Sequence, residues 1–117
     1  MLNQQKLIDF CHNHHVAVTA FSPFASGNLF TNAKIKAIAD KHNKSPAQVL
    51  IRYQIQRNVS VLIKTTNSNR MEEHLNVFDF NLTPDHIKQI HSLNNNTRKF
   101  QMTEAKQHKY YPFNHPF

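Results

Sequence analysis

The residues best suited to chemistry follow a short apolar run near the middle of the chain. Residues 59–63 are mostly apolar and β-prone, which predicts a buried strand. The side chains that follow, where the chain turns into a predicted helix, include those of Lys64, Thr65, Asn67 and Arg70. Cations, hydroxyls and backbone N–H groups gathered at a helix N-terminus suit a phosphate. The alternative is a solvated turn whose polar residues only cap the next helix.

Hydrophobic spacing and capping signals predict the helices around this stretch. The predicted helices cover residues 4–14, 33–42 and 46–57, another runs from a cap at Asn67 or Asn69 to about residue 77, and a last one begins at Thr83-Pro84. The strongest signal is a capping box, in which Ser45 precedes a proline and Gln48 follows three positions after the cap. We expect inward-facing residues in the first of these helices to include Leu7 and Phe10. From residue 94 onward the periodicity fades into an irregular tail.

A second strand is predicted over residues 16–21, which are nearly continuous in apolar character, as in a strand covered on both faces. Ser22-Pro23 ends it, because the residue before a proline is pushed out of the helical region. This strand and the one over residues 59–63 are joined by a long helical connection, which predicts a parallel βαβ unit. Two strands do not form a stable sheet alone, so we expect a larger α/β fold or strands from a partner.

The amino-acid composition limits the classes of protein to which this chain can belong. The 117 residues carry 14 Lys and Arg against 7 Asp and Glu, a formal net charge of +7, with one cysteine and one glycine. So few glycines disfavour a turn-rich all-β fold. The positive field attracts phosphorylated ligands or polyanions without specifying a mechanism. The single cysteine, the lack of a signal-like N-terminus and the lack of a long apolar run lead us to expect a soluble, cytoplasmic protein.

Nine histidines and one cysteine raise the question of a metal or thiol site. His12, His14 and His15 cluster at the end of the first predicted helix, but His12 and His15 have no cysteine or carboxylate partner at zinc spacing. We therefore expect no metal site. Cys11 lies on an apolar helical face, so packing in the core is favoured over a reactive thiol.

Four blocks of the sequence, taken in order, resemble one protein family. They are VAVTAFSPFASG, SPAQVLIRYQIQRNVSVLIK, NRMEEHLNVFDFNLTPDHIKQIHSLN and the terminal YYPFNHPF. Together they look like the C-terminal part of an aldo-keto reductase, with the aldose-reductase branch as the nearest match. The resemblance covers nearly the whole chain. Because several blocks agree in one order, it is more specific than any single motif.

The resemblance implies an α/β fold, namely the C-terminal part of a (β/α)8 TIM barrel that is incomplete as a barrel. Residues 16–21 would form strand seven and residues 59–63 strand eight. Residues 1–117 would together form the C-terminal part of an NADP-dependent oxidoreductase domain. TIM barrels place a phosphate site in the loops after strands seven and eight, which agrees with the anion interpretation of the stretch after residue 63.

The resemblance also implies which side chains bind cofactor and substrate. Lys64 would contact the cofactor phosphates, and Arg70 would pair with the adenosine 2′-phosphate and lie against the adenine, since a planar guanidinium suits both. The implied cofactor-binding residues are Phe21, Ser22, Phe24, Ser26, Lys64, Thr65, Asn67, Arg70, Glu73 and His74. Phe100 and Met102 would line the substrate rim. The implied ligands are NADP(H) and a small carbonyl compound, an aldehyde or ketone that the family reduces to an alcohol.

Departures from the family pattern bear on these roles. Phe21 stands where the family has a tyrosine stacked on the nicotinamide, so the ring face is kept and the hydroxyl is lost. His74 replaces an asparagine that helps to hold the adenine, and the loop over residues 26–33 is shorter than the usual clasp. The family's catalytic aspartate, tyrosine, lysine and histidine lie upstream of residue 1. We therefore expect no catalytic residue here and no reductase activity from these residues alone.

Two hypotheses of function remain open from the sequence. The first is the cofactor-phosphate subsite and substrate rim of an aldo-keto reductase, which could associate with a complementary barrel half or with itself. The second is a non-enzymatic basic module that binds nucleic acid or another polyanion, and the scattered basic residues make it the weaker choice. The aromatic tail, with Tyr110, Tyr111, Phe113 and Phe117, either packs on the body of the fold or binds a partner.

Overall fold

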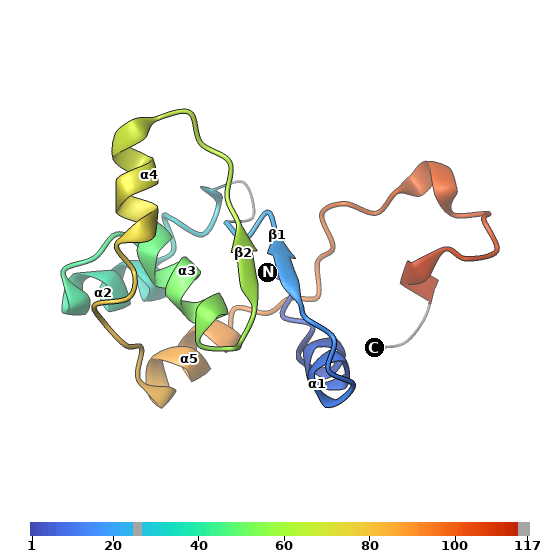
Figure 1. The fold of residues 1–117 in the computed structure, drawn as a ribbon, viewed down its shortest axis with the longest axis horizontal. Coiled ribbons are helices and arrows are strands. Elements are labelled where there is room, and N and C mark those ends of the chain that lie inside the picture. The colour runs from blue at the N-terminus through green and yellow to red at the C-terminus, as the bar shows by residue number, and fades with distance from the viewer. Residues whose placement is uncertain (25–26, 115–117) are drawn as a thin grey trace.

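The computed structural model describes residues 1–24 and 27–114 (Figure 1). Its helices are α1 (Gln5–Asn13), α2 (Ala33–His42), α3 (Pro46–Ile55), α4 (Ser68–Leu75) and α5 (Pro84–His91), and its strands are β1 (Thr19–Phe21) and β2 (Ser60–Leu62). The tail contains the short 3-10 helices η2 (Thr103–Ala105) and η3 (Pro112–Asn114). Each predicted α-helix is present, with small differences at its ends. Within the described ranges, no helix is long and apolar enough to cross a bilayer.

Capping side chains explain where α3, α4 and α5 begin. The Ser45 hydroxyl accepts a hydrogen bond from the Gln48 N–H, and the Gln48 side chain accepts one from the Ser45 N–H, which is the predicted capping box. Thr83 and His86 form a second capping box at α5, and Asn67 caps α4. These caps satisfy N–H groups that the first turn of a helix leaves free.

β1 and β2 pair in parallel, and the chain between them carries α2 and α3. The partners in register are Thr19 with Ser60, Ala20 with Val61, and Phe21 with Leu62. The predicted parallel βαβ unit is therefore confirmed. The two strands form an open, two-stranded sheet, and both are shorter than the ranges 16–21 and 59–63 predicted from the sequence.

Helices cover only one face of this sheet. The side chains of Phe21 and Leu62, which lie opposite each other on the other face, are 74% and 63% exposed. On the covered face, Val61 packs against the helical core. The prediction that both strands are buried is therefore wrong for Phe21 and Leu62. An apolar run indicates a strand, but burial depends on what covers each face, since side chains alternate between the two faces.

The hydrophobic core lies among α2, α3, α5 and the segment of residues 77–82 between α4 and α5. Its most deeply buried side chains include Ile35, Ile38, Tyr53 and Ile90. Figure 1 shows α2, α3, α4 and α5 gathered on the side of β2, whereas α1 lies on the side of β1. The inward faces predicted for α2 and α5 are thus confirmed at these isoleucines, because apolar residues at helical spacing form one stripe along each helix.

α1 packs less completely than the other helices. Ile8 is buried, whereas Phe10 is 49% exposed and Leu7 and Cys11 are half-buried. The prediction that Phe10 faces the core is therefore wrong, and Cys11 meets its predicted core position only in part. The helix is oriented so that Ile8, and not Phe10, faces the core. Helical spacing alone does not determine this orientation.

The tail folds on itself. Tyr111 is 6% exposed, its ring centroid lies 5.3 Å from that of Phe113, and its hydroxyl donates to the Gln101 carbonyl. The Arg98 guanidinium lies 3.9 Å from the centroid of the Phe113 ring. Figure 1 shows the tail leading away from the helices, so these aromatic residues do not pack on the described helices, and packing on a complete barrel stays a prediction. Phe117 lies outside the described residues.

Candidate functional site

The carboxyl ends of β1 and β2 lie at one edge of the sheet, because the strands are parallel and in register. Ser22 follows β1 at this edge, and residues 63–67 follow β2 and lead into α4. Figure 1 shows this second segment running from the end of β2 to the start of α4. In parallel α/β folds ligands bind outside the carboxyl ends of the strands. The fold therefore brings predicted site residues from both loops to a common edge.

Two side-chain hydrogen bonds organise the turn before α4. Thr65 Oγ1 accepts from the Asn67 N–H at 3.2 Å, and Asn67 Oδ1 accepts from the Arg70 N–H at 3.1 Å. The capping interpretation of this stretch is therefore confirmed for Asn67. Within the part of the chain that the structure describes, the N–H groups of Ser68 and Asn69 have no hydrogen-bond acceptor. They remain available to a ligand, as is usual for the first N–H groups of a helix.

Two cations flank this turn. Lys64 precedes it, Arg70 lies in the first turn of α4, and both side chains are exposed. The first turn of α4 holds no acidic residue. Among residues 1–24 and 27–114 the ion pair that forms lies elsewhere, between Lys44 and Asp79 at 2.7 Å. Lys64 and Arg70 thus lie beside a helix N-terminus without a carboxylate partner among the described residues, an arrangement that attracts an anion.

Aromatic contacts connect the loop after β1 to α4 and the end of β1 to the tail. The ring centroids of Phe24, in the loop, and His74, on α4, lie 5.5 Å apart. Those of Phe21, at the end of β1, and Phe100, in the tail, lie 5.4 Å apart. Both separations are typical of direct aromatic packing. The fold thus brings together, in pairs, residues that are distant in sequence and predicted for one site.

Glu73 lies against the N-terminus of α3. Its Oε1 accepts a hydrogen bond from the Ser45 hydroxyl, and its backbone carbonyl accepts one from Gln48 Nε2 at 3.0 Å. Sequence reasoning assigned Ser45 and Gln48 only to the start of α3 and so missed their contact with α4. The available signal was the amide group of Gln48, whose two N–H hydrogens have no role in a capping box.

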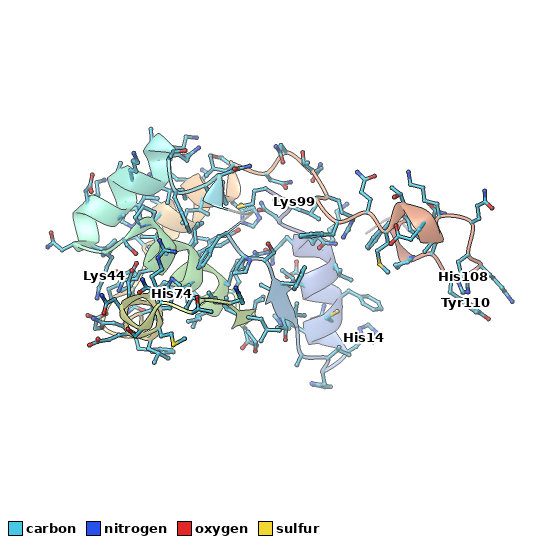
Figure 2. The ribbon with its side chains drawn as sticks, turned by 90° about the horizontal axis from the view of Figure 1, so that it is seen from above. His14, Lys44, His74, Lys99, His108 and Tyr110 are labelled. Atoms are coloured by element: carbon cyan, nitrogen blue, oxygen red, sulfur yellow. The ribbon has the colours of Figure 1, made fainter. Side chains whose placement is uncertain are left out.

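The remaining predicted site residues are Ser22, Ser26, Phe100 and Met102. Ser22 has a φ of 53°, which gives a sharp turn directly after β1. Phe100 and Met102 are 51% and 54% exposed and line a hollow formed by residues 99–104 of the tail. Figure 2 shows His108 and Tyr110 at the outer end of the tail, far from His74 on α4. Ser26 lies outside the described residues.

The histidines do not gather into a metal site in the described part of the chain, where no group of three or more His, Cys, Asp or Glu side chains could hold an ion. His42 and His86 instead form a pair between α2 and α5, with Nε2 and Nδ1 3.2 Å apart. Burial lowers the pKa of His86, the charges of His42 and Lys41 lower it further, and Asp85 raises it. The pair belongs to the packing of two helices, away from the turn before α4.

Comparison with known proteins connects this chain to one family. The model of the Aldo/keto reductase family matches residues 1–95. Aldo-keto reductase family 1 member C15 of Rattus norvegicus is 42% identical over 123 residues, which cover 96% of this chain and 38% of that protein. Prostaglandin F synthase 2 of Bos taurus is 39% identical over 127 residues, which cover 99% of this chain and 39% of that protein.

A solved structure agrees with these relatives. The aldose reductase from Schistosoma japonicum matches with a TM-score of 0.93 at 34% identity, over 99% of this chain and 38% of that one. The chain therefore spans well under half the length of the proteins it matches. The match supports a small α/β arrangement in which helices pack on an open, parallel pair of strands. On the family model and the relatives together, the chain belongs to the aldo/keto reductase family.

Proposed function

We propose that these residues form the cofactor-phosphate subsite of an NADP(H)-dependent aldo-keto reductase, together with part of its substrate rim. The observation that carries the proposal is the turn before α4, where Lys64, Arg70 and the first N–H groups of the helix leave positive charge uncompensated. This donor set fits the adenosine 2′-phosphate, because phosphate oxygens accept hydrogen bonds from cations and from helix N-termini alike.

Each polar side chain of the turn has a hydrogen left to donate. The oxygen of Thr65 is used by the Asn67 N–H, so its hydroxyl hydrogen is available, and the oxygen of Asn67 is used by the Arg70 N–H, so its amide hydrogens are available. In the proposed subsite both side chains donate to the 2′-phosphate. Arg70 pairs with the same phosphate and lies against the adenine, while Lys64 contacts the cofactor phosphates.

The other proposed cofactor residues surround this group. Phe21 presents a ring face to the nicotinamide, without the hydroxyl usual in the family, and the proposal assigns Ser22, Phe24 and Ser26 to the pyrophosphate. His74, which packs against Phe24, supports the adenine. Glu73 uses Oε1 for Ser45, so the proposal assigns its Oε2 to the adenine amino group. A carboxylate has acceptor capacity for both bonds.

In this class of reaction, bound NADPH supplies a hydride to a carbonyl compound. The catalytic residues implied by the family resemblance have no counterpart among residues 1–117, so we infer that these residues alone bind cofactor without reducing a carbonyl. The proposal assigns β1 and β2 to strands seven and eight of a TIM barrel and Phe100 and Met102 to the substrate rim. The exposed face that carries Phe21 and Leu62 would then meet a complementary barrel half or a second copy.

Arg70→Ala tests the proposal. We expect calorimetric titration of the unchanged protein to show tighter binding of NADPH than of NADH, because only NADPH carries the 2′-phosphate. Hydrogen bonds to charged groups are worth about 1.5–3 kcal/mol, so Arg70→Ala raises the Kd for NADPH roughly 10- to 100-fold and changes that for NADH little. Arg52→Ala, which makes the same charge change on α3, is the matched control.

Equal affinity of the unchanged protein for the two cofactors refutes the proposal, because the subsite is defined by the 2′-phosphate. Binding to DNA of any sequence, with an affinity that falls steeply as the salt concentration rises, would favour the polyanion-binding alternative instead.

A further inference from the structure

We propose that Gln48 is a positioning residue that holds α4 in the orientation in which Asn67 and Arg70 meet the 2′-phosphate. The inference rests on the proposed function and adds a residue of α3 that is not among the predicted cofactor-binding residues. In this role Gln48 determines the preference for NADPH over NADH without touching either cofactor.

Apolar packing contributes little to the position of α4, because none of its own residues is buried. Its apolar side chains Met71 and Leu75 are 48% and 73% exposed. A helix of eight residues is also too short to be stable by itself. The position of α4 therefore depends on polar contacts with neighbouring elements and on the ring contact between Phe24 and His74.

Gln48 makes the polar contacts that fasten the C-terminal end of α4. Its side chain is buried, and its Nε2 donates to the Glu73 carbonyl at 3.0 Å and to the Asn76 carbonyl at 2.9 Å. Its Oε1 accepts from the Ser45 N–H at 2.9 Å, within the capping box of α3. Both donor hydrogens and the acceptor oxygen of the amide are thus used. One side chain caps the start of α3 and the end of α4 at once.

Two neighbours of Gln48 strengthen this junction. The Ser45 hydroxyl donates to Glu73 Oε1, and Lys44 Nζ donates to the Asn76 carbonyl at 3.3 Å. Figure 2 shows Lys44 and His74 on the side of the molecule where α4 meets α3. A cation beside the last carbonyl groups of a helix is also favourable for the helix dipole. The C-terminal end of α4 is therefore the fastened end, and the other end carries the proposed phosphate site.

The contacts at the C-terminal end of α4 affect the proposed phosphate site at its N-terminal end, because the helix moves as one rigid element. Eight residues at about 1.5 Å each span about 12 Å, so a tilt of about 10° at one end moves the other by about 2 Å. Hydrogen bonds from Asn67 and Arg70 do not tolerate such a shift, because their donor–acceptor distances vary by only about 0.5 Å. NADH has no 2′-phosphate, so its binding depends less on the orientation of α4.

Gln48→Glu separates the two roles of the side chain. Glutamate provides the acceptor that a capping box needs, so α3 keeps its start. It has no hydrogen to donate at neutral pH, so both bonds to the carbonyls of Glu73 and Asn76 are lost. Gln56→Glu is the matched control, since Gln56 donates to the Leu82 carbonyl at 3.0 Å and accepts from its N–H at 2.7 Å. The control loses one donor and gains the same charge, without a contact to α4.

The measurements are the Kd values for NADPH and NADH, by calorimetric titration, and hydrogen exchange of the α4 amides. We expect Gln48→Glu to raise the Kd for NADPH about tenfold, to keep that for NADH within about twofold, and to speed exchange in α4. Gln56→Glu keeps both the preference and the exchange rates. Ser45→Ala removes a single side-chain contact to α4, together with the cap that the hydroxyl forms at the start of α3. It is expected to lower the preference by a smaller factor, which also provides the test if Gln48→Glu does not fold.

A folded Gln48→Glu protein that keeps its preference for NADPH overturns the inference and leaves the proposed function standing. An equal loss of preference in Gln56→Glu also overturns it, because the change of charge alone would then explain the effect. No preference for NADPH in the unchanged protein refutes the proposed function, and the inference fails with it.

Discussion

The hydrogen bond between Tyr53 and His91 is the contact whose removal tests most directly how α3 and α5 are held together. Tyr53 is 0% exposed, and its hydroxyl lies 3.0 Å from His91 Nδ1. Burial raises the pKa of the Tyr53 hydroxyl, and the charge of Arg57 lowers it by less, so the hydroxyl stays protonated and can donate to an unprotonated Nδ1. Tyr53→Phe removes this bond and leaves the ring in place.

The cost of Tyr53→Phe follows from what the change leaves behind. A net hydrogen bond is worth about 0.5–1.5 kcal/mol, and an acceptor left without its partner adds to the loss. The ring remains, so no cavity forms of the kind that makes Phe→Ala in a core cost about 3–5 kcal/mol. We therefore expect the free energy of unfolding at pH 8 to fall by about 1–2 kcal/mol.

Protonation of His91 makes the stability of the fold depend on pH. Burial lowers the pKa of His91, and the charge of Arg57 lowers it further. The folded state therefore binds the proton less readily than the unfolded state, whose pKa is about 6.5. The resulting stabilisation is full above that pH and is lost as the pH falls through the lower folded pKa. A protonated Nδ1 donates to the Tyr53 oxygen, and hydrogen bonds to charged groups are stronger than neutral ones, so we expect Tyr53→Phe to cost at least as much at pH 5 as at pH 8.

Urea denaturation at pH 8 and at pH 5, followed by far-ultraviolet circular dichroism, measures both effects. Tyr110→Phe is the control, because Tyr110 is 73% exposed and its hydroxyl makes no hydrogen bond within the described residues. The control is expected to change the free energy of unfolding by less than about 0.5 kcal/mol. A Tyr53→Phe protein as stable as the unchanged one at pH 8, or one with a clearly smaller cost at pH 5 than at pH 8, refutes the reasoning.

Two further predictions concern the same core. Ile38→Ala leaves a cavity between α2 and its neighbours, since Ile38 is 1% exposed, and is expected to lower the free energy of unfolding by about 2–5 kcal/mol in urea denaturation. His86→Gln keeps an acceptor for the Thr83 N–H but takes up no proton. Because burial and then His42 lower the pKa of His86, the unchanged protein is expected to lose stability between pH 8 and pH 5, and the variant to lose less. Denaturation at the two pH values measures this loss of stability. An equally steep loss in both proteins would exclude His86 as its cause.

Capping and anion binding are compatible in the turn before α4, although the sequence presents them as alternatives. Asn67 caps the helix with its oxygen, and Thr65 accepts from the Asn67 N–H with its own. Both side chains keep their hydrogens for a ligand, because an amide or a hydroxyl accepts and donates through different atoms. The cap also fixes the orientation of both groups. In the proposed subsite this order exists before the cofactor binds, which lowers the entropic cost of binding.

The sequence by itself determined the starts of α3 and α5, the parallel strand pair and the family. Ser45, Asn67 and Thr83 each cap through a partner three residues away, so the information for each start lies in a short stretch. The long helical connection requires a parallel pair, because a parallel crossover needs that length. The family followed from several blocks in one order, and the match to residues 1–95 confirms it.

Only the tertiary structure decided which surfaces are covered and how α4 is held. The exposure of Phe21 depends on which face of the sheet the helices cover, and its own apolar character does not determine that. The bonds from Ser45 to Glu73 and from Gln48 to Asn76 each cross 28 residues of sequence. Local patterns cannot identify such partners, because a buried donor pairs with whichever acceptor the packing of distant elements brings within hydrogen-bonding distance.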